Sequence, residues 1–340
     1  MEALVISEIG VTKVQEVENP SLNPNEVLLD VRHVGLCGSD LATFRGLNPL
    51  SKLPRIPGHE IGGVIEQVGA DVPAAFAIGD AAIVIPYTAC GECSSCKKGK
   101  VNACKFNKTL GVQKDGGMSE KIAIPFDRLI VNNFLPSHHL ALIEPLSVGF
   151  HAAARGKIQN GETVVVLGAG MIGVGAILGA INLGAKVIAV EVSEEKTKIL
   201  NQIGVDTVLN PTKCDVGAEL ASITDDAGPD VVIEAVGLPA TFRSAIDYVG
   251  FGGRVVYVGY SKAEVSYDTT LFNLKELDIC GSRNAVRDDF ETVIEFVTAN
   301  PKTSDLLISR IFPWSEVEQS FSYWEENRSG VFKVMVELSK

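Results

Sequence analysis

Residues 168–173 read Gly-Ala-Gly-Met-Ile-Gly, which is a G-x-G-x-x-G motif. A β-branched apolar run at 163–167 precedes it, and a stretch of helical character follows it. The next strand-like run, 187–191, ends in Glu191. A glycine motif between a strand and a helix, with an acidic residue about 20 positions further on, is typical of a dinucleotide-binding unit. The stretch therefore predicts a parallel sheet with a bound dinucleotide.

Each glycine of the motif has its own expected task. Gly168 allows the tight turn, Gly170 lets the backbone approach a pyrophosphate, and Gly173 permits close helix packing. Glu191 can accept both ribose hydroxyls and would repel a 2′-phosphate, so we predict NAD rather than NADP as cofactor. A glycine-rich turn that binds nothing is the alternative. The other predicted cofactor-binding residues are Lys196, for a ribose contact, and Ile172, Val236 and Arg283.

Outward from the motif, strands alternate with helical stretches over 147–283, which predicts an α/β fold with a Rossmann-type, doubly wound parallel sheet. Residues 1–146 read as short strands separated by turns, so we expect a β-rich domain to which the tail, 284–340, returns. The segment 163–185 is uncharged and long enough to span a bilayer. Because six glycines divide it into a strand, a turn and a helix, we reject that interpretation.

Composition narrows the class of partner. A chain of 340 residues is long enough for about two domains. Its formal net charge of -12 disfavours nucleic acid and anionic membranes, so a small molecule is the expected ligand. The first residues lack the basic and apolar regions of a signal peptide, which leads us to expect a cytoplasmic protein with reduced thiols.

Four of the seven cysteines lie in one run, 90–104, which reads CGECSSCKKGKVNAC. Disulfides are not expected among reduced thiols, and a two-cysteine redox motif would not need four of them. Four thiolates can surround a tetrahedral zinc ion and leave no open position, so we predict a structural zinc on Cys90, Cys93, Cys96 and Cys104. A nucleic-acid-binding zinc module is the alternative, which the negative charge opposes.

A second set of zinc-ligand types is spread along the β-rich region. Cys37, His59 and Glu144 could supply three protein ligands and leave a fourth position open, as catalytic zinc sites do. Spacing this wide does not establish a site, because a buried cysteine or a capping glutamate is commoner than a ligand.

With these motifs in place, the whole chain resembles the zinc-dependent medium-chain alcohol and polyol dehydrogenases. The matching segments occur in family order and include Cys37-Gly38-Ser39-Asp40, Pro57-Gly58-His59-Glu60, the cysteine run, residues 141–149 and the glycine motif. The Glu144 segment is similar to sorbitol dehydrogenases. Residues 85–87 and 115–118 resemble bacterial gulonate and galactonate 5-dehydrogenases.

The resemblance implies a GroES-like catalytic domain over 1–146 and 284–340, beside a cofactor domain at 147–283. It implies a catalytic zinc on Cys37 and His59, with Glu144 or Glu60 completing the ligands, and a homodimer or homotetramer. The implied reaction moves a hydride from a secondary alcohol to NAD, while Ser39 accepts the hydroxyl proton. Many relatives carry a proton-relaying histidine where this chain has Ala42, so the later relay must differ.

Two enzyme alternatives stay open: a threonine 3-dehydrogenase-like amino-alcohol oxidiser and a zinc-free reductase of the quinone type. Zinc-free relatives would not be expected to keep Cys37, His59 and Glu144 together. We expect structural or surface roles for the remaining histidines, His33, His138, His139 and His151, and ordinary thiols at Cys214 and Cys280. The basic side chains that could meet a sugar acid's carboxylate are Arg45, Lys52, Arg55, Lys114 and Arg283.

Overall fold

The computed structural model describes residues 1–338 and divides the chain into two compact units. The first unit holds residues 1–144 and 294–340, and the second holds 145–293. From the sequence we predicted these boundaries at 146/147 and 283/284. The last two residues of the predicted tail, 339 and 340, lie outside the described part of the chain. Each unit has its own sheet and its own buried aliphatic core.

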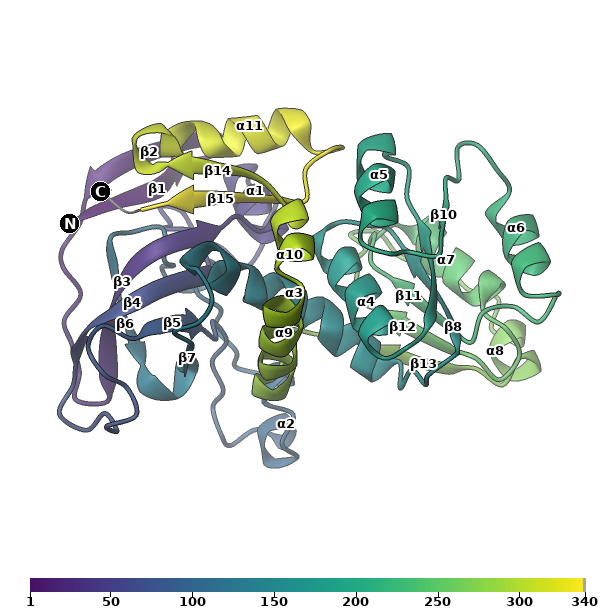
Figure 1. Cartoon of the computed structure of the whole chain (residues 1–340), viewed down its shortest axis with the longest axis horizontal. Helices are drawn as coiled ribbons and strands as arrows, with labels where there is room; N and C mark the ends of the chain where they lie inside the picture. The colour runs from purple at the N-terminus through teal and green to yellow at the C-terminus, as the bar shows by residue number, and fades with distance from the viewer. Residues whose placement is uncertain (339–340) are drawn as a thin grey trace. The chain divides into compact units, whose positions relative to one another are not determined.

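The sheet of the second unit has six parallel strands in the order β10-β9-β8-β11-β12-β13 (Figure 1). This order confirms the doubly wound fold, and it reverses direction between β8 and β11, where the carboxyl ends of the strands form the ligand crevice of such sheets. The inner strands β8, β9 and β11 read as nearly continuous apolar runs because helices cover both faces of the sheet. Their bounds are β8 Thr163–Leu167, β9 Lys186–Val190, β10 Thr207–Leu209, β11 Val231–Glu234, β12 Arg254–Tyr257 and β13 Asp278–Gly281.

The helices of the second unit follow the strands in alternation. The long uncharged segment resolves into β8, a tight turn and α4, whose small residues pack against β8, β9 and β11. No helix among the described residues is long and apolar enough to cross a membrane. The helices are α4 Met171–Asn182, α5 Glu194–Gln202, α6 Val216–Ile223, α7 Pro239–Tyr248 and α8 Thr270–Leu274.

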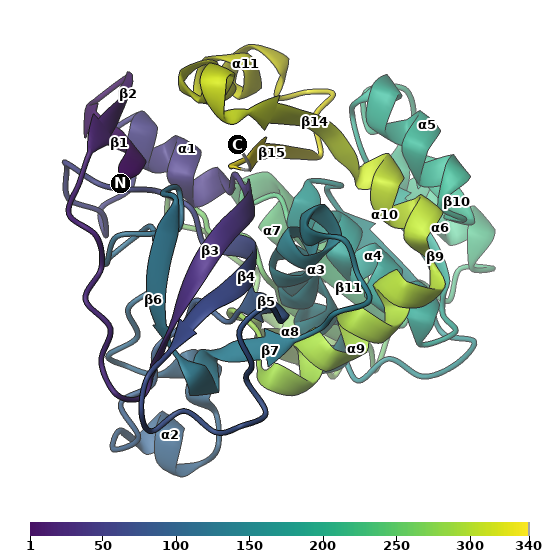
Figure 2. The same cartoon turned by 60° about the vertical axis from the view of Figure 1, so that its left-hand side comes forward.

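The first unit is built on a mostly antiparallel sheet around β3, which pairs with β4, β6 and β15 (Figure 2). Because β15 comes from the end of the chain and pairs with β3, the last strand belongs to the sheet of the first unit. The hairpin β1 Glu2–Glu8 and β2 Val11–Glu16 forms a separate two-stranded sheet. The remaining strands are β3 Glu26–Gly35, β4 Glu60–Val68, β5 Ala81–Val84, β6 Lys121–Pro125, β7 Leu129–Val131, β14 Ile308–Pro313 and β15 Lys333–Glu337.

The helices between these strands range from one turn to the 19 residues of α3, and they carry several candidate residues. The boundary between the two units, at 144/145, falls within α3. This helix contains Pro145, which has no backbone N–H to donate to a helical hydrogen bond. The helices are α1 Gly38–Phe44, α2 Ser94–Lys97, α3 Ser137–Arg155, α9 Arg287–Ala299, α10 Pro301–Leu307 and α11 Ser320–Asn327, with 3-10 turns η1 Val101–Ala103, η2 Phe126–Arg128 and η3 Trp314–Gln319.

Candidate functional site

Cys37 stands between the central strand β3 and helix α1, where it occupies the N-cap position of α1. Asp40, three residues on, accepts a hydrogen bond from the Cys37 backbone N–H at 2.9 Å. This is the carboxylate half of a capping box, which fixes the direction in which the chain enters the helix. Asp40 is fully buried and also accepts the Gly58 N–H at 3.2 Å. One carboxylate therefore ties the Cys37 turn to the segment that carries His59.

His59 directly precedes β4, and Glu60 is the first residue of that strand. Gly58 adopts a positive φ of 96°, which a residue with a side chain rarely does, and this turn presents His59 towards the β3–α1 turn. One ligand atom each from Cys37, His59 and Glu60 lies within 4.8 Å of the others. The structure thus brings together three of the predicted zinc ligands from separate parts of the chain.

The surroundings of His59 favour a positive charge. Burial acts to lower the pKa of His59, but the neighbouring Cys37 and Asp40 outweigh it and raise that pKa well above its ordinary value. The ring is 5% exposed, and its Nδ1 has no hydrogen-bond partner among the described residues. Zinc in proteins is bound by cysteine sulfur, histidine nitrogen and carboxylate oxygen atoms, and this buried site offers one of each next to negatively charged groups. The residues are therefore suitable ligands for a zinc ion.

Glu60 is held by a buried lysine that the sequence reading did not single out. Lys333 on β15 is 1% exposed, and its Nζ donates to both carboxylate oxygens of Glu60 at 2.6 Å. The same ammonium group donates to the Leu36 carbonyl at 2.9 Å. Gly35 faces Glu60 across the β3–β4 ladder, and a Cβ there would lie 2.0 Å from a Glu60 carboxylate oxygen. A side chain at position 35 would therefore displace Glu60.

Glu144 lies in α3 immediately before Pro145 and is 3% exposed. It is not among the three residues grouped around Cys37, yet it is close enough to His59 and Glu60 to interact with both electrostatically. Burial raises the pKa of Glu144 to about 7. The buried Tyr87 hydroxyl donates a hydrogen bond to one carboxylate oxygen of Glu144. Each candidate carboxylate thus has a partner of its own, Lys333 for Glu60 and Tyr87 for Glu144.

Ser39 lies in the first turn of α1, two residues after Cys37. Its Oγ is buried and has no hydrogen-bond partner among the described residues. A buried hydroxyl without a partner is costly, so a position like this one is suited to a hydroxyl that arrives with the substrate. Ala42, one turn further along α1, offers no group that could carry the proton onward.

The four clustered cysteines form a second centre on a loop that extends away from the sheet of the first unit in Figures 1 and 2, where α2 marks it. The Sγ atoms of Cys90 and Cys96 are 4.0 Å apart, as are those of Cys93 and Cys104. In a tetrahedral zinc site with Zn–S bonds near 2.3 Å, sulfur atoms lie about 3.8 Å apart. The cluster therefore already has nearly the size that a zinc ion requires.

Backbone amides point at these sulfur atoms. The N–H groups of Cys90 and Phe106 donate to Cys104 Sγ at 3.3 Å, and the Cys93 N–H donates to Cys90 Sγ at 3.3 Å. The N–H groups of Cys96 and Lys105 lower the pKa of the Cys93 thiol to about 6. Hydrogen bonds of this kind stabilise thiolates, the form that binds metal. All seven cysteines are free of disulfides.

The glycine motif forms the turn between β8 and α4. Gly168 has a φ of 87°, and a Cβ at Gly173 would lie 2.0 Å from the Gly168 carbonyl oxygen, so both positions need glycine. Gly170 is the N-cap of α4, and a Cβ there would meet nothing within 4 Å. That open space lies at the N-terminus of a 12-residue helix, where a pyrophosphate is stabilised. Ile172 lies in the first turn of the same helix.

Glu191 follows β9 and is 8% exposed. Its carboxylate accepts the backbone N–H groups of Ala169, Val192 and Ser193 at 2.8–2.9 Å, which fixes it beside the glycine turn. Lys196 is 9% exposed in α5; burial lowers its pKa, although the charge of Glu191 acts in the opposite direction. A carboxylate held at the end of the second strand fits the ribose of a dinucleotide.

Two further predicted cofactor-binding residues occupy surface positions in the second unit. Val236 is 42% exposed just after β11, and its Cγ2 would be 2.5 Å from a Cβ at Gly168, so it borders the glycine turn. Arg283 is exposed after β13.

Sequence reasoning missed Asp40, Tyr87 and Lys333 as supports of the first centre. The spacing Cys37-x-x-Asp40 resembles a capping box and could have identified Asp40. Lys333 is a single charge inside the apolar run 331–336, which indicates a buried and therefore paired lysine. The local sequence around Tyr87 does not reveal its contact with Glu144, because the two residues are 57 positions apart.

Two of the basic residues that could bind the carboxylate of a sugar-acid substrate already form ion pairs within the chain. Arg45 donates to the Glu325 carboxylate from Nε at 2.6 Å, and Arg55 pairs with Asp115 at 2.8 Å. Lys52 and Lys114 are exposed. The structure therefore leaves Arg45 and Arg55 with carboxylate partners from the chain itself.

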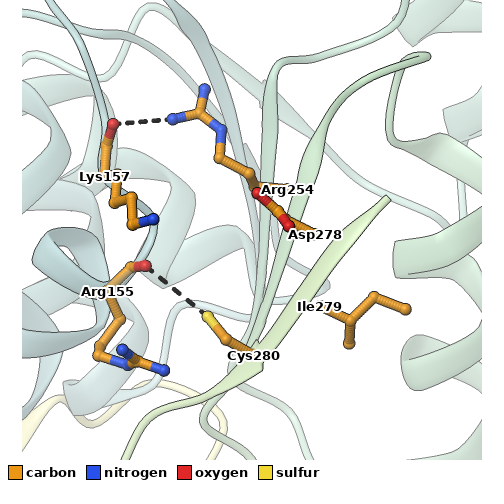
Figure 3. A pocket seen from close by; sticks show the side chains of 6 residues that line it. All are labelled: Arg155, Lys157, Arg254, Asp278, Ile279 and Cys280. Atoms are coloured by element: carbon orange, nitrogen blue, oxygen red, sulfur yellow. Dashed lines mark hydrogen bonds between the residues drawn. The ribbon is translucent and has the colours of Figure 1, made fainter. Parts of the chain in front are cut away.

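A small pocket in the second unit lies away from these candidates (Figure 3). Arg254 and Asp278 line it and begin β12 and β13, so it is at the amino ends of those strands, whereas dinucleotides bind at the carboxyl ends. Arg254 is already engaged by the carbonyl oxygens of Gly156 and Lys157 and by Glu162. Burial raises the pKa of the Cys280 thiol in this pocket, which disfavours its thiolate form.

Comparisons with known proteins agree with this arrangement. The alcohol dehydrogenase GroES-like domain model matches residues 23–133, and the zinc-binding dehydrogenase model matches residues 172–299. The L-galactonate-5-dehydrogenase of Escherichia coli is 33% identical, with 89% of each chain covered. The sorbitol dehydrogenase of Bacillus subtilis is 32% identical, with 99% of this chain and 97% of the relative covered.

Comparison with solved structures also shows similarity to dehydrogenases. RspB of E. coli CFT073, an alcohol dehydrogenase complexed with NADH, superposes with a TM-score of 0.92 at 28% identity and 99% coverage of both chains. A Sinorhizobium meliloti 1021 protein assigned as a zinc-binding dehydrogenase, bound to NADP, superposes with a TM-score of 0.89 at 27% identity and 99% coverage of both chains. The fold alone therefore accommodates either dinucleotide.

Proposed function

The chain belongs to the zinc-binding alcohol dehydrogenase family, and from this premise we propose that it oxidises a secondary alcohol of a polyol, sugar or sugar acid to a ketone, with NAD accepting the hydride. The observation that carries the proposal is the convergence of Cys37, His59 and a buried carboxylate beside Ser39, whose hydroxyl has no partner among the described residues. These residues combine a metal donor set with a group that can take a proton.

The chemistry divides between the metal, the cofactor and the chain's own side chains. When bound by Cys37, His59 and Glu60 or Glu144, zinc supplies the Lewis acidity that lowers the pKa of an alcohol. Ser39 Oγ accepts the hydroxyl proton and, because Ala42 cannot relay a proton, releases its own proton to water. Asp40 keeps the Cys37 turn and the His59 segment together, while Lys333 and Tyr87 orient the two carboxylates.

NAD is the proposed cofactor because the charge that faces the expected ribose is negative. Glu191 is fixed by three backbone amides, so it is not free to turn away from a 2′-phosphate. The finer choice between the cofactors is tested by kcat/KM for NAD and NADP on the same substrate. A preference for NADP would contradict the role given to Glu191.

The substrate class follows from the relatives, whose printed activities are on L-galactonate and sorbitol. They do not favour the threonine dehydrogenase-like alternative. The test is a screen of NAD reduction over polyols, aldonates, aldoses and L-threonine, with zinc measured on the same sample. We expect turnover with a polyol or an aldonate. Turnover with threonine alone would refute the substrate class, and turnover that survives complete zinc removal would instead support a zinc-free reductase.

A further inference from the structure

Three of the five histidines gather in the first unit, and none of them belongs to the centres described above. His33 lies on β3, and His138 and His139 lie in the first turn of α3. The ring centroids of His33 and His138 are 5.7 Å apart, and those of His138 and His139 are 4.5 Å apart, both in edge-to-face contact. We call these three residues the histidine cluster. Their spacing in the sequence gave no indication of it, because His33 is far from the other two.

Two carboxylates flank the histidine cluster. Asp305 on α10, next to the start of α3, lies 2.7 Å from His139 Nε2 and 3.9 Å from His138 Nε2 through the same oxygen. Glu337 on β15 is the register partner of His33 on β3 and interacts electrostatically with His33 and His138. Negative charge thus approaches the imidazoles from two different elements.

The distances suit a metal ion. Single ligand atoms of His138, His139 and Asp305 all lie within 4.8 Å of one another. Ligand atoms of a tetrahedral site with metal–ligand bonds near 2.05 Å lie about 3.3 Å apart, so only small side-chain rotations are needed. Imidazole nitrogens with a carboxylate oxygen are a ligand set for zinc, nickel, copper or cobalt rather than for magnesium or calcium.

An ion from solvent can reach the site, and negatively charged side chains lie next to it. The His139 side chain is 5% exposed, which fixes its position, whereas those of His138 and Asp305 are 30% and 63% exposed and leave a path for an ion. The positive end of the helix dipole disfavours a protonated imidazole and a bound cation alike, so cation binding here depends on nearby negative charge. The carboxylates of Asp305 and Glu337 then offset the charge that a cation brings.

We propose that His138, His139 and Asp305 bind one divalent transition-metal ion, with His33 and Glu337 placed around it. This site shares no residue with Cys37, His59, the two carboxylates beside them or the cysteine loop. The proposal therefore does not depend on the reaction that the protein catalyses. In the absence of metal, the same His139–Asp305 hydrogen bond joins α3 to α10.

The test counts ions. Protein carrying its resident zinc is dialysed against Ni²⁺ at neutral pH and gel-filtered, and both metals are then measured per chain. We expect one nickel ion per chain beyond an unchanged zinc content. His139→Gln and Asp305→Asn should each weaken nickel binding by about tenfold or more, since each removes one ligand.

His151→Gln is the matched control, because His151 Nδ1 makes a 2.8 Å contact with Asp289 in the second unit and thus resembles the His139–Asp305 pair. This variant should bind nickel as the unaltered protein does. If His139→Gln fails to fold, His138→Gln decides the question, since that side chain is partly exposed. An absence of additional nickel, or equal affinity in the ligand variants and the control, would show that the cluster serves only to join α3 to α10 and would overturn the proposal.

Discussion

The cysteine loop and the centre around Cys37 are two candidate zinc sites with opposite environments. The loop draws all four sulfur ligands from fifteen consecutive residues, and backbone amides of that loop point at the sulfur atoms. The Cys37 centre assembles mixed candidate ligands from the turn between β3 and α1, the start of β4 and α3, and buried side chains hold them. A closed set of four ligands stabilises a loop, whereas a set with an open position beside a free hydroxyl can perform chemistry.

The largest effect is expected from Cys37→Ser. Serine is a preferred N-cap, so α1 and its Asp40 contact should be retained while the metal ligand is lost. A metal supplies several kcal/mol of transition-state stabilisation, so kcat/KM should fall by about 10³-fold or more with little change in Tm. Steady-state kinetics and a thermal melt on one preparation check this, and a large fall in Tm would show that the Cys37 centre is also structural.

Cys93→Ser should reverse that pattern. Cys93 is the N-cap of α2, and serine again preserves the cap, so the loss falls on zinc binding. Because zinc contributes directly to the folding of a structural site, we expect a lower Tm, one zinc fewer per chain and near-normal kcat in the protein that remains folded. If the variant loses turnover without losing stability, the division of labour between the two regions is wrong.

Lys333→Met tests how the Cys37 centre is supported. The substitution leaves the fully buried Glu60 carboxylate without its ammonium partner, and breaking a buried pair in this way costs about 3–5 kcal/mol. Denaturant unfolding should show this loss. The double variant Lys333→Met/Glu60→Gln should recover a large part of it, because the uncompensated charge is gone. Simple additivity of the two single variants would mean that the pair does not act as a unit.

The cysteine loop and the Cys37 centre also differ in how much of their structure could be predicted from the sequence. The cysteine loop is contiguous, so four clustered thiols predicted a four-sulfur group, and the glycine motif with the alternation of strands and helices predicted a doubly wound parallel sheet. The Cys37 centre depends on long-range packing, and only the resemblance to a family assembled Cys37, His59 and Glu144 into a set. Its supports were not predictable in detail, since the Lys333–Glu60 pair forms only when β15 returns to β3.

The histidine cluster shows the same limit more strongly. Neither His33 nor Asp305 lies near His138 in sequence, and no spacing rule connects a strand, a helix start and a second helix. The pairing of β15 with β3 places Glu337, and the packing of α10 places Asp305. Side chains that meet only through tertiary structure leave no periodic signal, which is why the histidines read individually as structural or surface residues.

Ser39→Ala should have a smaller effect than loss of the metal ligand. Removing a positioned proton acceptor reduces turnover by about 10²-fold at the lower end of such effects, because water can partly replace the hydroxyl. The reduction in kcat should lessen as pH rises and hydroxide becomes available. A pH profile identical to that of the unaltered enzyme would remove Ser39 from the mechanism.

The smallest effect concerns single thiols within the cysteine loop of zinc-free protein. The amides of Cys96 and Lys105 lower the pKa of Cys93 to about 6, whereas burial and the neighbouring Cys93 raise the pKa of Cys96 to about 11. Since the thiolate is the reactive form, alkylation of Cys93 by iodoacetamide should rise through about pH 6 and then level off.

Cys96 in the same sample is the internal control, and its alkylation should stay slow up to about pH 10 because its thiol remains protonated. Mass spectrometry of the digested protein separates the two rates. If both cysteines instead react with a common inflection near the ordinary thiol pKa, the loop has lost its amide contacts without metal. The zinc ion would then create the geometry of this loop, whereas distinct inflections mean that the chain prepares the geometry before the ion arrives.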